Sequence, residues 1–212
     1  METGTAGLVR APQQDRSRRA VRKLLDSAEA TFAEQGYDRA SVRSIAAHAG
    51  VPKGTLYQFF VNKEAVLDAV VADLVEEVDR IFGQLSAVGL DSERTPVESM
   101  VGHVVDGVLD LASRRPAFRT LFSGLATTGP LAAAGVRIRQ CYRAHTEAAL
   151  GRVDRASPVA FAKVSTVCTE ITRGLLPSIV DERGHIDRQL APELSFAISS
   201  YLTSVKQRSE RR

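Results

Sequence analysis

The sequence predicts an all-α protein, in which a three-helix N-terminal head precedes a larger helical C-terminal domain. Two observations predict this class: apolar residues recur at helical spacing along most of the 212 residues, and no candidate strand interrupts them. Turns that contain glycine and proline separate the periodic stretches. The predicted division is an arm over residues 1–15, a head over 16–62 and the larger domain over 63–212. Because the arm has no apolar period, it is expected to be disordered.

The first helix is predicted over residues 17–35, with Gly36 as its end. Its apolar face consists of Val21, Leu24, Leu25, Ala28 and Phe32. This face is expected to be the core surface for the two short helices that follow. Tyr37 is expected to pack beneath them, with its hydroxyl at the rim.

Two short helices are predicted next. Ser41 suits the N-cap of the first, because its hydroxyl can accept a hydrogen bond from a free backbone N–H of the first turn. Gly50 can adopt the left-handed conformation that ends this helix. Pro52 suits the first turn of the second helix, where its missing N–H is no loss. Leu56 and Phe60, four residues apart, give the second helix one apolar side.

Two short helices joined by a glycine-bearing turn form the helix-turn-helix pattern, whose second helix enters the DNA major groove. The run Pro52-Lys53-Gly54-Thr55-Leu56-Tyr57, followed by Phe60 and Asn62-Lys63-Glu64, resembles the recognition-helix signature of the tetracycline-repressor-like (TetR) family of bacterial transcription regulators. The resemblance covers roughly residues 16–78. Phe59 and Val61 stand where the family often has histidine and proline, so the resemblance gives no DNA contact to residue 59.

The resemblance implies a set of DNA contacts. The predicted DNA-binding residues are Ser41, Arg43, Lys53, Gly54, Thr55, Tyr57, Gln58 and Lys63. Lys53, Thr55 and Gln58 are the expected base readers. Lys63, at a helix N-terminus, is the expected phosphate clamp, and Arg43 either holds the backbone or reaches a guanine edge. The others are expected to contact the backbone or to permit close approach.

Positive charge is concentrated at the N-terminal end. Residues 1–63 hold ten Lys and Arg against six Asp and Glu, whereas residues 64–212 hold eighteen against nineteen. A surface that contacts phosphate requires such an excess, although chance placement on a solvated surface would also produce it. Five basic residues between Arg16 and Lys23 either follow the DNA backbone and minor groove or form a solvated tail.

The larger domain is predicted to contain six helices. They span residues 62–83, 95–113, 116–125, 131–150, 158–180 and 190–206, with the loosest boundary over 83–95. Asn62 is the predicted N-cap of the first. Gly102 and Gly107 lie inside a helical pattern, where each glycine destabilises the helix by about 1 kcal/mol relative to alanine. They are therefore expected to make room for a close neighbour or for a ligand.

The last two predicted helices carry more apolar surface than one intramolecular face needs. The first of them contains Phe161, Val164, Val167, Cys168, Ile171, Leu175 and Leu176, with few charges. The position of this helix pair resembles the four-helix dimer interface of the TetR family, which implies a homodimer. An ordinary monomeric core is the alternative.

The resemblance also implies that the C-terminal domain takes up a small molecule that releases DNA. The candidate pocket residues are apolar or amphipathic side chains on helices expected to surround a cavity: Met100, His103, Phe118, Phe122, Tyr142 and Thr172. Their mixed polarity implies a mostly hydrophobic ligand with a few polar anchors. Glu170 and Arg173, three residues apart, are predicted to form an ion pair.

Several other classes of protein are disfavoured by the sequence. No stretch approaches a membrane span, and residues 1–14 lack the apolar core of a secretory signal, so a cytoplasmic protein is expected. Cys141 and Cys168 have neither CxxC spacing nor a neighbouring histidine cluster, and we predict two buried free thiols, with no metal or cofactor. GxSxG, HExxH, P-loop and GxGxxG patterns are absent from the sequence.

Two interpretations follow. The leading one is a homodimeric repressor that binds double-stranded operator DNA and responds to a small-molecule effector. The alternative is a helical enzyme or small-molecule-binding protein whose head is a vestige; DNA affinity with a steep salt dependence separates the two.

Overall fold

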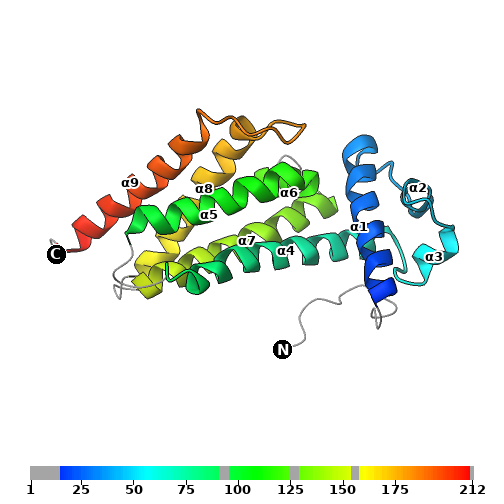
Figure 1. The fold of residues 1–212 in the computed structure, drawn as a ribbon, viewed down its shortest axis with the longest axis horizontal. Coiled ribbons are helices and arrows are strands. Elements are labelled where there is room, and N and C mark those ends of the chain that lie inside the picture. The colour runs from blue at the N-terminus through cyan, green and yellow to red at the C-terminus, as the bar shows by residue number, and fades with distance from the viewer. Residues whose placement is uncertain (1–14, 91–95, 125–128, 154–157, 211–212) are drawn as a thin grey trace.

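The computed structural model describes residues 15–90, 96–124, 129–153 and 158–210 (Figure 1). The arm predicted over residues 1–15 lies almost wholly outside this part of the chain. The described residues form helices and turns, with an isolated β-bridge between Val180 and Ile186. The all-α prediction is therefore confirmed. None of the described helices is both long and apolar enough to cross a membrane.

Helices α1 (Asp15–Gln35), α2 (Val42–His48) and α3 (Lys53–Tyr57) form the head, at one end of the molecule (Figure 1). Leu24, Ala28 and Ile45 are buried between α1 and α2, as the helical spacing predicts. Gly36 and Gly50 both have positive φ, of 76° and 64°, and end the first two helices. These local stop signals were therefore enough to place the ends of both helices.

A capping box begins α2. The Ser41 hydroxyl accepts a hydrogen bond from the Ser44 backbone N–H at 3.1 Å, and the Ser44 hydroxyl accepts one from the Ser41 N–H at 2.9 Å. Two free backbone donors are satisfied in this way. Leu56 on α3 and Phe60 just after it are both 0% exposed, which anchors the short α3 to the head.

Helix α4 (Lys63–Ala87) runs from the head into the C-terminal domain (Figure 1). Its N-cap is Asn62, whose side-chain oxygen accepts a bond from the Ala65 N–H at 2.8 Å, as predicted. The predicted end near Gly83 is wrong, because the helix continues for another turn that buries Leu85. That burial outweighs the roughly 1 kcal/mol cost of a glycine inside the helix.

Five more helices complete the C-terminal domain: α5 (Val97–Arg114), α6 (Pro116–Ser123), α7 (Gly129–Val153), α8 (Pro158–Ile179) and α9 (Ala191–Glu210). Each agrees with a predicted helix, although α7 begins two residues earlier and ends three residues later than expected, and α9 extends four residues further. Helix α4 packs along α7, and α9 packs on α5 and α8.

The two glycines inside α5 differ in role. A Cβ atom on Gly107 would lie 2.8 Å from the Cγ2 atom of Ile81 on α4, so Gly107 permits the close crossing of α4 and α5. A Cβ atom on Gly102 would meet nothing within 4 Å. The expectation of a close neighbour is therefore confirmed for Gly107 only.

The turn between α8 and α9 is docked on the corner between α5 and α6. The Ser113 hydroxyl donates to the Gly184 carbonyl oxygen at 2.7 Å, and Arg119 Nη2 donates to the Glu182 carbonyl oxygen at 2.8 Å. Gly184 has a φ of 85°, and a Cβ atom there would lie 2.3 Å from the Ser113 carbonyl oxygen. Only glycine fits this close approach.

Candidate nucleic-acid interface and small-molecule pocket

The side of α3 opposite the buried Leu56 faces solvent. Lys53, Gly54 and Gln58 are exposed, and Thr55 is half-buried at the edge of the same surface. The four residues therefore lie where a helix entering a groove would present them. The chain folds this way locally because Leu56 and Phe60 hold one side of α3 against the head.

Three more predicted DNA-binding residues are exposed on α3 and α2 and at the N-cap of α2. Tyr57 is 43% exposed, and its ring lies 5.2 Å from the Lys53 Nζ atom, a cation–π contact that holds both side chains on one surface. Arg43 is exposed on α2. Ser41 is exposed at the N-terminus of α2, where its hydroxyl takes part in the capping box. The base and phosphate contacts of these residues remain predictions.

Lys63 has a structural role that the sequence did not reveal. Its Nζ atom donates to the carbonyl oxygens of Tyr37 at 2.8 Å and Asp38 at 3.3 Å, and lies 4.2 Å from the Tyr37 ring centroid. The half-buried Lys63 thus ties the start of α4 to the turn between α1 and α2. One of its three ammonium donors is left for a phosphate, so the clamp role remains a prediction.

Tyr37 lies beneath the head, as predicted. Its side chain is buried, its ring packs 5.3 Å from that of Phe32, and its hydroxyl donates to Glu64 at 3.4 Å. Burial, followed by the Glu64 carboxylate, raises the pKa of Tyr37 to about 12. Phe59 is also buried, at 7% exposed, and belongs to the head core. This burial agrees with a head in which residue 59 makes no DNA contact.

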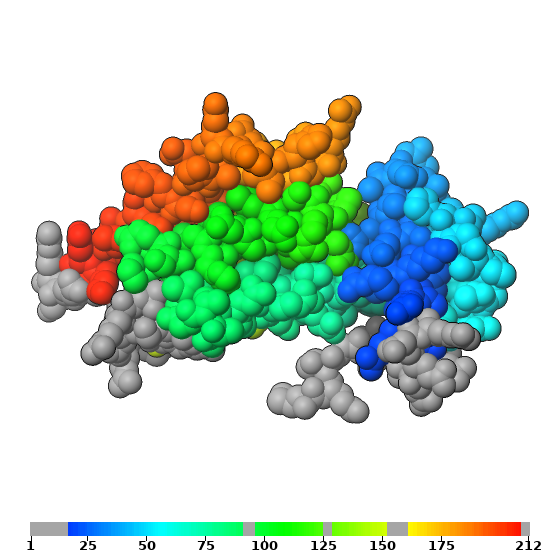
Figure 2. Space-filling model, viewed as in Figure 1, coloured from blue at the N-terminus to red at the C-terminus, as the bar shows by residue number. Residues whose placement is uncertain are grey.

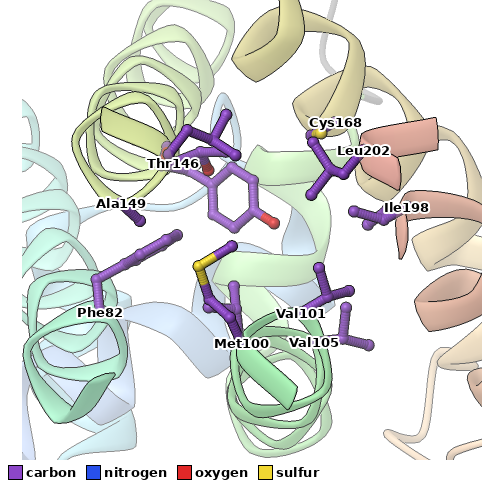
Figure 3. A pocket seen from close by; sticks show the side chains of 12 residues that line it. Phe82, Met100, Val101, Val105, Thr146, Ala149, Cys168, Ile198 and Leu202 are labelled. Carbon is purple, nitrogen blue, oxygen red and sulfur yellow. Dashed lines mark hydrogen bonds between the residues drawn. The ribbon is translucent and has the colours of Figure 1, made fainter. Parts of the chain in front are cut away.

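The C-terminal domain contains a partly open apolar cavity of about 30 Å³ (Figure 3). Side chains from α4, α5, α7, α8 and α9 line it, and Figure 3 shows Phe82, Met100 and Cys168 pointing toward it from three of these helices. Its polar side chains are Tyr142, Thr146 and Cys168. The volume is about that of one water molecule in the liquid.

The six predicted pocket residues differ in their distance from the cavity. Met100 and Tyr142 line the cavity. Thr172 lies behind it, with its hydroxyl 3.3 Å from that of Tyr142, and Phe122 packs edge-on against the Tyr142 ring at 5.3 Å. Phe118 is a further layer away, stacked 5.1 Å from Phe122.

His103 is half-buried on α5 and is not a lining residue. The sequence analysis missed Phe82, Cys168, Ile198 and Leu202, which do line the cavity. Phe82 could have been found, because it lies four residues after the core residue Val78 on the same helical face. The other three are set by how α8 packs on α7 and how α9 packs on α5.

Burial controls the chemistry of the polar groups in the cavity. It raises the pKa of the Tyr142 hydroxyl to about 12, and that of the Cys168 thiol to about 12 as well. Both groups are therefore neutral at physiological pH. The cavity can offer an apolar molecule a few neutral hydrogen-bonding groups, which fits the mostly hydrophobic ligand that the sequence implies.

The other cysteine differs from its prediction. Cys168 is buried as expected, but Cys141 on α7 is only half-buried. Its thiol donates to the Asp79 carboxylate on α4 at 3.3 Å. The helical spacing places Cys141 at the edge of the α4–α7 contact, and the prediction of two buried thiols is wrong for this residue.

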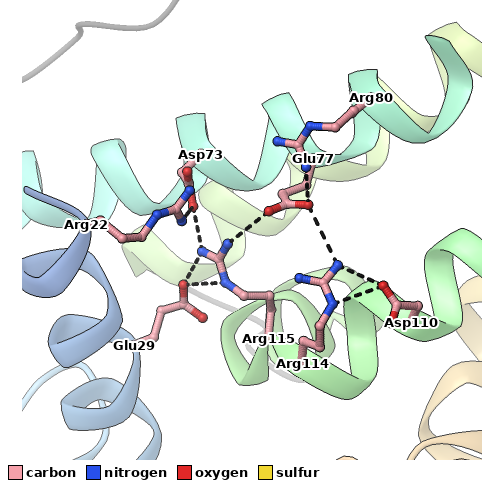
Figure 4. Close-up of polar contacts among 8 residues, drawn as sticks. All are labelled: Arg22, Glu29, Asp73, Glu77, Arg80, Asp110, Arg114 and Arg115. Carbon is pink, nitrogen blue, oxygen red and sulfur yellow. Dashed lines mark hydrogen bonds and ion pairs between the residues drawn. The ribbon is translucent and has the colours of Figure 1, made fainter. Parts of the chain in front are cut away.

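Buried charges join the head to the C-terminal domain (Figure 4). Arg115, between α5 and α6, contacts Glu29 on α1 and both Asp73 and Glu77 on α4; we call these four residues the junction cluster. The Arg115 Nε atom donates to Glu29 Oε1 at 2.8 Å, and its Nη2 atom lies 2.8 Å from Asp73 Oδ2. Arg115 and Glu29 are 8% and 4% exposed.

Arg115 remains charged in this position. Burial alone would lower its pKa, but hydrogen bonds and charge interactions with Glu29 and Asp73 raise the pKa above its ordinary value. Arg22 at 2.6 Å from Asp73 and Arg80 at 2.6 Å from Glu77 extend the junction cluster toward solvent. One guanidinium thus contacts two helices, α1 and α4, at once.

Figure 2 shows the head as a lobe at one end of the molecule. A groove of about 550 Å³ lies between α1 and the helices α6 and α8. Arg119, Asp181 and Glu182 contribute to its lining, so it is polar, unlike the cavity in the C-terminal domain.

The predicted ion pair of Glu170 and Arg173 is confirmed on α8, where the Arg173 Nε atom lies 2.6 Å from Glu170 Oε2.

Known proteins resemble this chain over both domains. Residues 24–70 match the family described as bacterial regulatory proteins, tetR family, and residues 96–202 match the tetracyclin repressor-like C-terminal domain. The transcriptional repressor KstR2 of Rhodococcus jostii is 36% identical over 92 residues, which are 42% of this chain and 45% of that protein. The match thus spans less than half the length of this relative.

The transcriptional regulator UidR of Escherichia coli is 26% identical over 187 residues, which cover 82% of this chain and 86% of that protein. A putative TetR-family regulator from Syntrophomonas wolfei has the same fold, with a TM-score of 0.68 at 17% identity over 89% of this chain and 95% of that one. A structure described as a SmeT–triclosan complex has a TM-score of 0.58 at 22% identity, over 84% of this chain and 90% of that one.

The two matched segments together account for most of the chain, and the second alone covers more than half of it. They coincide with the head and with the helices that surround the cavity. The chain therefore belongs to the tetR family of bacterial regulatory proteins.

Proposed function

We propose that this protein is a DNA-binding transcriptional regulator, a homodimeric repressor that leaves its operator when a small, largely apolar effector enters the C-terminal cavity. The observation that carries the proposal is the arrangement of α4 and α5. Both helices line the cavity, and both adjoin the junction cluster that holds α1 of the head.

DNA binding rests on the exposed side of α3. Lys53, Thr55 and Gln58 would reach base edges in the major groove, where a lysine suits guanine and a glutamine suits adenine. Ser41, Arg43, Tyr57 and Lys63 would hold the phosphate backbone, and Gly54 leaves space for it to approach. The relatives named as transcriptional repressors and regulators support this role.

A homodimer would present two such helices about one DNA turn, or ~34 Å, apart. Helices α8 and α9 expose apolar side chains that a second copy would cover. Val167 and Leu175 on α8 are 37% and 38% exposed, and Phe196 on α9 is 69% exposed. Such a row of apolar groups on two neighbouring helices is typical of an interface.

Release would begin in the cavity. At about 30 Å³ the cavity is too small for a drug-sized molecule, which occupies several hundred Å³. An effector would therefore have to push α4 and α5 apart. Phe82 lies about one and a half helical turns from Glu77, so a shift of α4 at the cavity reaches the junction cluster within ~8 Å.

The junction cluster would convert this shift into a movement of the head. Arg115 follows directly after α5, and its contacts to Glu29 and Asp73 hold α1 and α4 in one arrangement. A ligand that binds one arrangement of these helices better than the other shifts the population of head positions. The distance between the two recognition helices in a dimer would change with it.

The test is a fluorescence-anisotropy titration against DNA from upstream of the protein's own gene and against a scrambled duplex, at two salt concentrations. We expect tighter binding to the upstream DNA, weakened by salt and saturating at two or more protomers per site. Equal, salt-insensitive binding to both duplexes would favour the alternative, a small-molecule-binding protein or enzyme with a vestigial head.

A further inference from the structure

Three side chains with metal-binding donor atoms meet on the outer side of the contact between α4 and α7. Asp79 lies on α4, and Cys141 and His145 lie one turn apart on α7. The Asp79 Oδ1 atom is 2.6 Å from His145 Nε2 and 3.3 Å from Cys141 Sγ. All three donor atoms lie within 4.8 Å of one another, and no other such group of three occurs among the described residues.

The geometry of the backbone explains why the three groups converge. Residues four apart on a helix project from the same face, so Cys141 and His145 both point toward α4. Asp79 projects from α4 into the space between them. Because the two helices pack along each other, the three Cα positions are held by the fold rather than by a flexible loop.

The donor set fits one class of ion. Thiolate sulfur, imidazole nitrogen and carboxylate oxygen are the ligands of Zn²⁺ and similar transition metals, whereas Mg²⁺ and Ca²⁺ prefer oxygen alone. Bonds of about 2.0–2.3 Å in a tetrahedral site place neighbouring donors about 3.3–3.6 Å apart. The sulfur is already near that distance from Asp79 Oδ1. The imidazole nitrogen, now 2.6 Å from the same oxygen, has to move away from it, and the sulfur and this nitrogen already lie within 4.8 Å of each other.

We propose that Asp79, Cys141 and His145 bind one divalent transition-metal ion of the zinc class, with water as the fourth ligand. The site is accessible, since the side chains of His145 and Asp79 are 35% and 51% exposed. The ion replaces the thiol proton that now bonds to Asp79. Its charge favours the thiolate that burial and the Asp79 carboxylate otherwise disfavour.

A neighbouring ring fixes the orientation of the imidazole. Phe82 stacks on His145, with ring centroids 5.3 Å apart and an angle of 18° between the planes. Such positioning of a ligand by its surroundings favours metal affinity, because less freedom is lost on binding. Phe82 also lines the apolar cavity and packs edge-on against Tyr142 at 5.5 Å. An ion on His145 therefore restricts one wall of that cavity.

A second aspartate–histidine pair, Asp181 and His185, serves as a comparison for the proposed metal site. His185 lies 3.1 Å from Asp181 in the turn after α8, but no third ligand joins them in the described part of the chain. The His185 side chain is 74% exposed. This pair is an exposed surface contact with only two ligand groups, and it should not hold an ion with useful affinity.

Cobalt(II) titration of the untagged, reduced, full-length protein tests the proposal. We expect one ion per chain, with the thiolate-to-cobalt charge-transfer absorption and the intense visible bands of tetrahedral cobalt, and we expect Zn²⁺ to displace it. Cys141→Ser removes the charge-transfer absorption. His145→Gln and Asp79→Asn each weaken binding about 10-fold or more.

Two matched variants serve as controls. Cys168→Ala removes the other thiol, and His185→Gln removes the other histidine of an Asp–His pair; both should keep the cobalt spectrum and affinity of the unchanged protein. A cobalt complex without sulfur absorption, or one unaffected by Cys141→Ser, would overturn the site. The readout is the bound ion itself, so it is independent of DNA binding.

A second measurement covers the case in which Cys141→Ser does not fold. Alkylation of the unchanged protein should modify Cys141 first, because Cys168 is buried. Saturating Zn²⁺ should slow that modification about 10-fold or more. An unchanged rate with Zn²⁺ would show that Cys141 is no ligand.

Discussion

The junction cluster and the apolar cavity both adjoin α4 and α5, but they consist of opposite kinds of side chain. At the junction, Arg115 is held by three carboxylates on two other helices. Around the cavity, the walls are aliphatic, aromatic and sulfur-containing side chains with a few neutral polar groups. The contacts of the junction cluster thus depend on direction and distance, whereas the side chains around the cavity can rearrange.

This difference indicates a division of labour. Paired charges at fixed distances either form together or are lost, because an unpaired buried charge is costly. Apolar side chains such as Met100 can repack around an added molecule at low cost. A deformable cavity suits the reception of a ligand, and a directional cluster suits the transmission of a small shift to the head.

The largest effect is expected at the junction. Arg115→Met leaves Glu29, Asp73 and Glu77 without the cation between them, and we expect the free energy of unfolding to fall by about 3–5 kcal/mol. Urea unfolding measures this. The matched control is Arg137→Met, whose guanidinium is 46% exposed, pairs with Asp68 outside the junction cluster and should contribute less than about 1 kcal/mol. Equal losses in the two variants would remove the distinction between junction and surface.

The contribution of the buried Tyr142 hydroxyl in the cavity to stability should instead be measurable at alkaline pH. Burial raises the pKa of Tyr142 to about 12, whereas an unfolded tyrosine titrates near 10. Below about pH 10 the hydroxyl is neutral in both the folded and the unfolded protein, and its contribution to the free energy of unfolding is complete. As the pH rises through about 12 this contribution is lost, because the unfolded tyrosine ionises first, and the free energy of unfolding falls by ~1 kcal/mol per pH unit. Tyr142→Phe should therefore have a shallower decline between pH 10 and 12. Parallel declines in the two proteins would contradict a buried hydroxyl.

The hydrogen bonds of Lys63 inside the head are expected to contribute less to stability than the junction cluster does. Lys63→Ala removes its bonds to the Tyr37 and Asp38 carbonyls, at about 1 kcal/mol of stability, and should also weaken DNA binding across all sequences. Thermal unfolding and anisotropy separate the two effects. Unchanged DNA affinity at moderate salt would show that Lys63 acts only as a structural tie.

At neutral pH the cavity should tolerate the loss of a hydrogen bond. In Tyr142→Phe the Thr172 hydroxyl keeps its bond to the Cys168 carbonyl oxygen at 2.9 Å, so the expected loss of stability is about 0.5–1 kcal/mol. Thermal unfolding at pH 7 measures it. A loss as large as that of Arg115→Met would mean that the cavity is as rigid as the junction.

The sequence predicted what local geometry determines. Ser41, Gly50 and Asn62 set the ends of helices through their own backbone and side-chain bonds, and these ends were predicted correctly. The end of α4 was not, because the burial of Leu85 depends on distant helices. The solvent-facing side of α3 followed from the spacing of Leu56 and Phe60.

The cavity and the junction depend on which helices meet. Arg115 and Glu29 are 86 residues apart, and nothing in either neighbourhood indicates that they pair. Met100 and Tyr142 were predicted as pocket residues from their chemistry, but Leu202 required the packing of α9 on α5. His103 was predicted by the same reasoning and lies outside the lining, since its helical face was unknown.

The proposed function requires α3 to read a DNA sequence in the context of a dimer. The most direct measurement is selection of duplexes from a random-sequence pool by the unchanged protein and by the double variant Lys53→Ala, Gln58→Ala. We predict that the unchanged protein enriches an inverted repeat with half-sites about one DNA turn apart, and that the double variant loses or changes the bases opposite α3. Enrichment of no sequence by the unchanged protein, or of the same sequence by both, would contradict the claim.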